Sequence, residues 1–146
     1  MKKRVEEWIH FAEADIKAIK KLIEDPSLSQ IAAFHCQQAV EKLFKALIED
    51  KLEKTPKIHD LGKLYGMILD NDPGINIQID ENVLSEINDV YIDTRYPPDL
   101  GLIPSGIPTK ETIERFIIEI EKVHNQIKEI LKYINIMIFL HAQGNP

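Results

Sequence analysis

The sequence is poor in cysteine, has three arginines, and contains no apolar run long enough to span a membrane. Its single cysteine, Cys36, can form neither an intramolecular disulfide nor a cysteine-rich zinc site. The most apolar segment, Tyr133 to Ala142, has about half the length that a membrane-spanning helix requires. Near the start, Glu6, Glu7 and Glu13 interrupt the stretch that would be apolar in a secretory signal. We therefore expect a cytoplasmic protein with no membrane association.

Length and charge limit the function further. The 146 residues suit one domain with its own core, and 44% hydrophobic with 29% charged residues is typical of a folded globular chain. The net charge of −6 opposes non-specific contact with a phosphate backbone, so nucleic-acid binding would need a local basic patch. The surroundings of Cys36 are apolar or uncharged, which favours a buried, inert thiol.

Apolar residues recur at steps of three and four in the first half of the chain, which predicts amphipathic helices. The first such pattern begins at Val5 and is stopped by Asp25-Pro26. A second helix is expected to begin at a capping box in which Ser27 covers free amides and Gln30 reaches back. Its apolar surface, which extends to Ile48, is wide enough to contact several neighbours, so it is predicted to be the central helix.

Three more helices are predicted in the second half. A short one covers Leu61 to Leu69 and ends before Asp72-Pro73-Gly74. Asp80 can cap a fourth that reaches Tyr91, and Thr109 can cap the last, which covers residues 113–131 and has an apolar pattern that continues to Ile138. The fold class is therefore all-α, with four to five helices in a bundle.

A polar stripe on the second helix consists of Gln37, Glu41, Lys45 and Glu49. Its members follow one another at i, i+4 steps, and Glu41 precedes Lys45 in the order that favours an ion pair. A charged stripe on a helix of an acidic protein is usually hydrated or lies at a dimer contact. We expect a solvated face here, with a lining role in a binding cleft as the alternative.

The long connection from Asp93 to Pro108 is the first place to look for a site. It contains four prolines and two glycines, and structureless connections of this length are often functional. Arg95 and Tyr96 stand before two prolines, where a stiff turn could present them to a phosphate or carboxylate. In the other interpretation, Arg95 pairs with a neighbouring aspartate and Tyr96 packs on the bundle.

The histidines indicate no metal site. His59 precedes Asp60, but adjacent residues on a helix do not face each other, so a role at the start of a helix is expected for this pair. The five histidines, at positions 10, 35, 59, 124 and 141, lack the spacing of metal ligands. We expect neither a metal nor a cofactor.

Three ordered motifs carry a family resemblance: FHCQQAVEKLFKALI (34–48), IHDL (58–61) and TRYP (94–97). With the opening helix at Trp8 to Asp25, they resemble the HEPN domain, and the resemblance covers about residues 4–132. We therefore expect a HEPN-like bundle over residues 1–132. Residues 133–146 form an apolar extension, which either continues the last helix or contacts a partner.

The resemblance implies an up-and-down bundle similar to the C-terminal domain of kanamycin nucleotidyltransferase, and usually a homodimer. Such proteins often act with a minimal nucleotidyltransferase, as two-component or toxin–antitoxin pairs. The family's features imply that Glu41, Lys42 and Lys45 line a cleft with the long connection. A nucleotide or phosphate would then be held by these residues together with the candidates Arg95, Tyr96 and His59.

Some HEPN proteins are metal-independent ribonucleases, whose motif is an arginine followed, after four to six residues, by a histidine. After Arg95, the positions that should hold the histidine are occupied by Leu100, Gly101 and Leu102. The spacing of the motif does occur from Arg4 to His10, but on the first helix, and we interpret this match as accidental. We therefore expect a binding and interaction module with no catalytic residues. The alternatives are a ribonuclease toxin and a purely structural dimeric adaptor.

Overall fold

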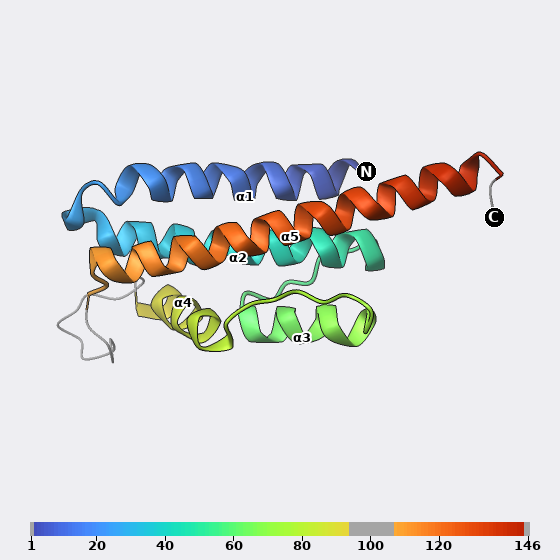
Figure 1. Cartoon of the computed structure of the whole chain (residues 1–146). Coiled ribbons are helices and arrows are strands. Elements are labelled where there is room, and N and C mark those ends of the chain that lie inside the picture. Colours follow the sequence, from blue (N-terminus) through green and yellow to red (C-terminus); the bar gives the residue numbers. More distant parts are fainter. Residues whose placement is uncertain (1, 94–106, 145–146) are drawn as a thin grey trace.

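The computed structural model describes residues 2–93 and 107–144, which form an up-and-down bundle (Figure 1). Five α-helices and one 3-10 helix occur in these ranges, and no strand. They are α1 (Lys3–Leu22), η1 (Pro26–Leu28), α2 (Ser29–Leu52), α3 (Leu61–Asn71), α4 (Glu81–Asp93) and α5 (Lys110–Ala142). The all-α prediction is confirmed. None of the described helices has the length and apolarity to cross a membrane.

Helix α2 is the central helix of the bundle, as predicted. It contacts α1, α3, α4 and α5. Small residues make the closest of these contacts possible, because Ala32, Ala33, Cys36 and Ala39 are fully buried and let neighbouring backbones approach. The core is completed by branched and aromatic side chains, among them the ring of Phe44, which stacks on Tyr65 with 5.8 Å between ring centroids.

Two predicted helix starts are confirmed and one is wrong. The Asp80 carboxylate accepts from the backbone of Asn82 and Val83, and the Thr109 hydroxyl accepts from the Thr112 amide. The capping box before α2 is absent. Asp25 caps the short η1 instead, because its carboxylate reaches the Ser27 amide at 3.0 Å, and α2 follows η1 with no side-chain cap.

Residues 75–79, in which isoleucine alternates with polar residues, pack along the bundle without forming a strand. Ile77 is buried, and its carbonyl accepts from the Tyr65 hydroxyl at 3.2 Å. The side-chain amide of Gln126 in α5 pairs with the backbone of Gln78: its Oε1 accepts from the Gln78 amide at 2.6 Å and its Nε2 donates to the Gln78 carbonyl at 2.8 Å. Side chains from two helices therefore satisfy the backbone groups that a neighbouring strand would otherwise pair.

Helix α5 has 33 residues, and its two ends differ. From Ile113 to Leu131 it places one apolar stripe in the core, with Phe116 and Ile127 fully buried. Its C-terminal part extends past the other helices, as the red end of the ribbon shows in Figure 1. We refer to residues 134–142 as the α5 tail.

Candidate functional site

The polar stripe of α2 is buried, so the expectation of a solvated face was wrong. Gln37, Glu41, Lys45 and Glu49 are at most 5% exposed. The physical reason is the central position of α2, which contacts α1, α3, α4 and α5. Burial is tolerated because every buried side-chain nitrogen and oxygen in the described part of the chain has a hydrogen-bond partner.

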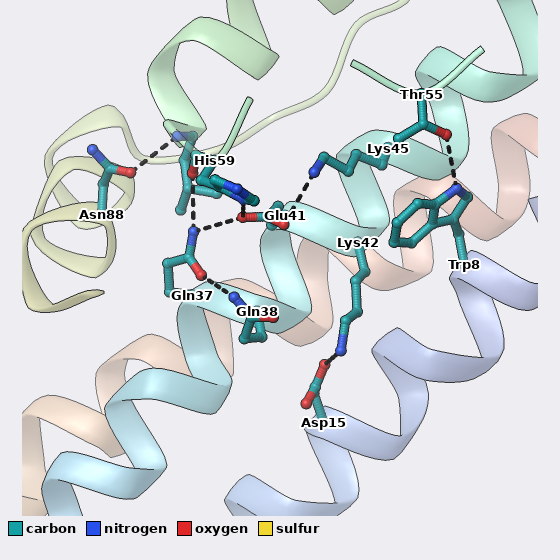
Figure 2. A network of polar contacts seen from close by, with 11 residues as sticks. Trp8, Asp15, Gln37, Gln38, Glu41, Lys42, Lys45, Thr55, His59 and Asn88 are labelled. Atoms are coloured by element: carbon teal, nitrogen blue, oxygen red, sulfur yellow. Dashed lines mark hydrogen bonds and ion pairs between the residues drawn. The ribbon is translucent and has the colours of Figure 1, made fainter. Parts of the chain in front are cut away.

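Glu41 is the centre of this network (Figure 2). Its carboxylate accepts from Gln37 Nε2 at 3.2 Å and from Lys45 Nζ at 3.1 Å, the ion pair that the sequence order predicts. It also lies 3.1 Å from His59 Nδ1. Three polar partners around one buried carboxylate compensate its loss of hydration and fix its orientation.

Lys45 lies between the Glu41 carboxylate and the indole of Trp8. Its ammonium nitrogen is 5.7 Å from the Trp8 ring centroid, within range of a cation–π interaction. The indole N–H donates to the Thr55 hydroxyl at 3.3 Å, so α1 and the segment after α2 close over the ammonium group (Figure 2). Lys45 is therefore a component of the network and is only 4% exposed.

Glu49 ends the stripe in a second group of contacts. Its carboxylate accepts the hydroxyl proton of Thr55 and pairs with Arg4 Nε at 3.3 Å. Arg4 is therefore held by Glu49 in α2, which gives a structural role to the first residue of the Arg4–His10 match.

His59 is the exposed member of the network, and it lies in the connection between α2 and α3. Its side chain is 59% exposed, against 7% for the Glu41 side chain that it meets. Gln37 Nε2 donates to the His59 carbonyl at 3.0 Å, so both backbone and ring are positioned by α2. Since a carboxylate only accepts, Nδ1 carries the hydrogen in this contact, and Nε2 lies on the opposite side of the ring.

Asp60 lies at the start of α3, as the sequence predicts, and does not orient His59. Its carboxylate caps α3 by accepting from the Lys63 amide at 2.9 Å and also accepts from Asn88 Nδ2 at 3.3 Å. Asn88 in turn accepts from the Leu61 amide at 3.0 Å, which ties α4 to the start of α3. The orienting carboxylate of His59 comes instead from Glu41, 18 positions earlier in the sequence.

A cavity of about 300 Å³ opens between α3 and α4, next to the residue that follows His59. Asp60, Tyr65, Glu81, Ser85 and Asn88 contribute polar groups to its lining. Two carboxylates make this wall unfavourable for a phosphate. Neutral donors and acceptors, such as those of a nucleobase or a ribose, suit it better.

Lys42 belongs to a separate cluster between α1 and α2. Its ammonium group lies 2.6 Å from Asp15, whose other oxygen is 2.8 Å from His35 Nδ1. Asp15 is only 6% exposed. The structure therefore brings together Glu41, Lys45 and His59, and gives Lys42 different partners (Figure 2).

Cys36 lies beside this cluster and is fully buried. Burial, and to a smaller extent the negative charge of Asp15, raises the pKa of the Cys36 thiol far above its ordinary value. The group stays protonated at neutral pH, as expected for a structural thiol.

Arg95 and Tyr96 lie outside the described residues, as do Leu100, Gly101 and Leu102. Sequence reasoning also missed Trp8 and Thr55 as members of the network. The Trp8–Thr55 contact joins residues 47 positions apart, and no local pattern signals such a pair. No group of three or more potential metal ligands occurs among the described residues.

Comparison with known proteins agrees with this architecture. The model of the HEPN domain family matches residues 5–131. Among solved structures, the chain is similar to the crystal structure of TT1696 from Thermus thermophilus, with a TM-score of 0.65 and 21% sequence identity. The similarity covers 88% of this chain and 98% of the other, and at this identity it supports the fold alone. The search of curated proteins gives no match.

A helical bundle whose central helix carries a buried polar stripe, with a family match over most of its length, defines the class of protein. The chain belongs to the HEPN domain family.

Proposed function

We propose that this protein is a cytoplasmic, homodimeric interaction module that binds a nucleotide and acts with a nucleotidyltransferase-type partner. The observation that supports the ligand site best is the contact between His59 and the buried Glu41. A buried network contacts the exposed imidazole of His59, and the next residue, Asp60, lines a polar cavity. Side chains fixed in advance bind with less loss of conformational entropy, which is the usual design of a ligand contact.

Charge distribution suggests how the nucleotide would lie. The cavity next to Asp60 suits a base or sugar, whereas a phosphate of the same nucleotide would approach the exposed imidazole of His59. Lys45 supports His59 through Glu41, 3.1 Å away, rather than by touching the ligand. Arg95 and Tyr96 remain predicted phosphate contacts from the long connection, and Lys42 is assigned to the α1–α2 cluster.

The proposed partners rest on the family. HEPN proteins are usually dimeric and often act with a minimal nucleotidyltransferase in two-component or toxin–antitoxin pairs. The acidic net charge of −6 agrees with a protein partner better than with general RNA binding. A small nucleotidyltransferase encoded beside this chain, and co-purifying with it, would support this part of the proposal.

Ribonuclease activity is the second candidate, and one observation favours it. Cleavage without a metal needs a base for the 2′ hydroxyl and a cation for the phosphate. A histidine is missing after Arg95, but His59 is held by a carboxylate, an arrangement that suits a general base. In this alternative, His59 and Arg95 would share one site.

Thermal-shift measurements with ATP, GTP, CTP, UTP and the four monophosphates test nucleotide binding. We expect at least one nucleotide to raise the Tm of the wild type and of the control His141→Ala, whose histidine lies in the exposed α5 tail. His59→Ala should reduce the shift. Absence of any shift at millimolar nucleotide, or an unchanged shift in His59→Ala, contradicts the site.

A fluorogenic RNA incubated with EDTA separates the second candidate from the first. Binding without cleavage supports the interaction module. Cleavage that is lost in both His59→Ala and Arg95→Ala supports the ribonuclease, whereas loss in His10→Ala alone would restore the Arg4–His10 match. The binding and cleavage measurements use the same variants and the same RNA concentrations.

A further inference from the structure

The α5 tail exposes apolar side chains around its whole circumference. Five consecutive residues are between 41% and 61% exposed: Ile136, Met137, Ile138, Phe139 and Leu140. Because an α-helix has about 3.6 residues per turn, five successive side chains point in all directions. A flat contact on one side would leave part of this surface in water, so the tail requires a surrounding groove or several helices.

A groove of about 610 Å³ lies at the base of the tail. Ile75, Ile130 and Ile134 line it with apolar surface. Polar groups border it, including the ion pair of Lys51 with Asp72, 2.9 Å long, and the exposed Glu129. An apolar floor with a polar rim is the usual form of a surface that receives a helix.

The groove and the tail are continuous along one face of α5. Ile130, Ile134 and Ile138 follow one another at i, i+4 steps, so they form one stripe that begins in the groove and ends on the tail. The family match ends at residue 131, before most of this stripe. The tail thus lies beyond the matched HEPN region, whereas the groove is lined, apart from Ile134, by residues within it.

We propose that the groove is occupied by the α5 tail of a second copy of this chain. Two α5 helices would cross antiparallel about a two-fold axis near Ile134. This register places Ile138 of each copy over Ile130 of the other, so both tails and both grooves are covered at once. Such reciprocity is what a closed two-fold interface requires. The inference rests on the homodimer in the proposed function and specifies its surface.

Size and charge support a second copy over other occupants. The exposed tail presents roughly 400 Å² of apolar surface per chain, and two tails with two grooves give on the order of 1,600 Å², a standard interface. Residues 134–142 contain no lysine or arginine and no polar face, unlike helices that lie on membranes. His141, the only titratable group of the tail, would lie within about one turn of Glu129 in the other copy.

Light scattering after size-exclusion chromatography tests the inference with Ile138→Asp. Ile118→Asp is the matched control, because Ile118 lies on the same helix and is 68% exposed. We expect the mass of a dimer for the wild type and the control, and a roughly 100-fold weaker dimer for Ile138→Asp, since the pairing would bury a charge. Circular dichroism should show unchanged helix content.

A cysteine crosslink gives a second readout that does not depend on a disruptive charge. Ile134→Cys, close to the proposed axis, should form a disulfide-linked dimer under mild oxidation, whereas Ile118→Cys should not. The native Cys36 is buried, so we expect the crosslink to form through the introduced cysteine.

The possible failures are distinguishable. A monomeric wild type overturns this inference together with the homodimer. A dimer that survives Ile138→Asp and gives no Ile134→Cys crosslink overturns only the tail pairing and leaves a homodimer through another surface. Co-sedimentation of the wild type, but not of Ile138→Asp, with phosphatidylcholine and phosphatidylglycerol vesicles would assign the tail to a membrane instead and also overturn the inference.

Discussion

Residues 37–49 of α2 bury four polar or charged side chains, whereas residues 136–140 of α5 leave five apolar side chains exposed. Both regions are regular helix, and both reverse the usual distribution of residue types. In α2 the reversal is compensated inside the chain, because Glu41, Lys45 and Glu49 have close partners. In the α5 tail no compensation occurs among the described residues.

The difference indicates two kinds of function. A buried polar network that is fully hydrogen-bonded fixes one arrangement of the groups at its surface end, here His59. An exposed apolar surface indicates instead an interaction that the isolated chain does not make. We therefore propose that the α2 network serves ligand recognition and the α5 tail serves assembly.

The largest effect is expected for Lys45→Ala, which leaves Glu41 buried without its cation. Loss of one partner of a buried pair should lower the free energy of unfolding by about 3–5 kcal/mol. Urea denaturation followed by circular dichroism measures the change. The exposed pair of Lys110 with Glu114 has the same i, i+4 spacing, so Lys110→Ala is the control, with a loss below about 0.5 kcal/mol. Equal losses of unfolding free energy in Lys45→Ala and Lys110→Ala would contradict a larger contribution from the buried ion pair than from the exposed one.

Two isoleucines of α5 compare its buried and exposed parts. Ile127 is fully buried and Ile138 is 61% exposed. Ile127→Ala should cost about 2–5 kcal/mol of unfolding free energy, because it leaves a cavity in the core. At dilutions that dissociate a dimer, Ile138→Ala should cost less than about 0.5 kcal/mol. A loss above roughly 1.5 kcal/mol for Ile138→Ala under these conditions would mean that the tail packs within its own chain.

A smaller effect is expected at the end of the α2 stripe. Glu49→Gln keeps the volume of the side chain but removes the charge that pairs with Arg4. The free energy of unfolding should fall by about 1–3 kcal/mol. Glu53→Gln, which removes the charge of the exposed Lys2–Glu53 pair, should change it by less than about 0.5 kcal/mol. Chemical denaturation of the two variants side by side decides whether Glu49 belongs to the network.

The smallest effect concerns Cys36 and becomes visible only at alkaline pH. Burial raises the pKa of this thiol in the folded state above its ordinary value near 9. Its contribution to stability is therefore complete below pH 9 and is lost as pH rises, because the unfolded chain ionises first. Between about pH 9 and 10.5, stability should fall less steeply in Cys36→Ala than in the wild type. Identical slopes would contradict a buried thiol.

Sequence reasoning predicted the helices because their periodicity and caps are local. Val5 to Ile19, Asp80 and Thr109 behave as their patterns indicate. It failed for the stripe of α2, since burial of Glu41 and Lys45 depends on Trp8 and His59, which are distant in the sequence. The same limit applies to His59: Asp60 lies at the start of α3 as expected, but no local pattern indicates that Glu41 supplies the carboxylate that contacts His59.

The candidate site was predicted in part. Glu41, Lys45 and His59 come together in the structure, and Lys42 has other partners. Arg95 and Tyr96 stay predictions, because they lie outside the described residues. A motif can indicate which residues matter, but only the packing of α1 and the α2–α3 connection on α2 decides which of them meet.

The most direct test of the account is an NMR titration of the His59 ring with the nucleotide that gives the largest thermal shift. The account predicts a saturable change of the His59 Cε1–H signal in the wild type. The change should weaken at least about tenfold in affinity in Glu41→Gln/Lys45→Met, a neutral pair that keeps the interior filled. A His59 signal that does not respond to saturating nucleotide, or that responds equally in the double variant, would contradict a site organised by the buried network.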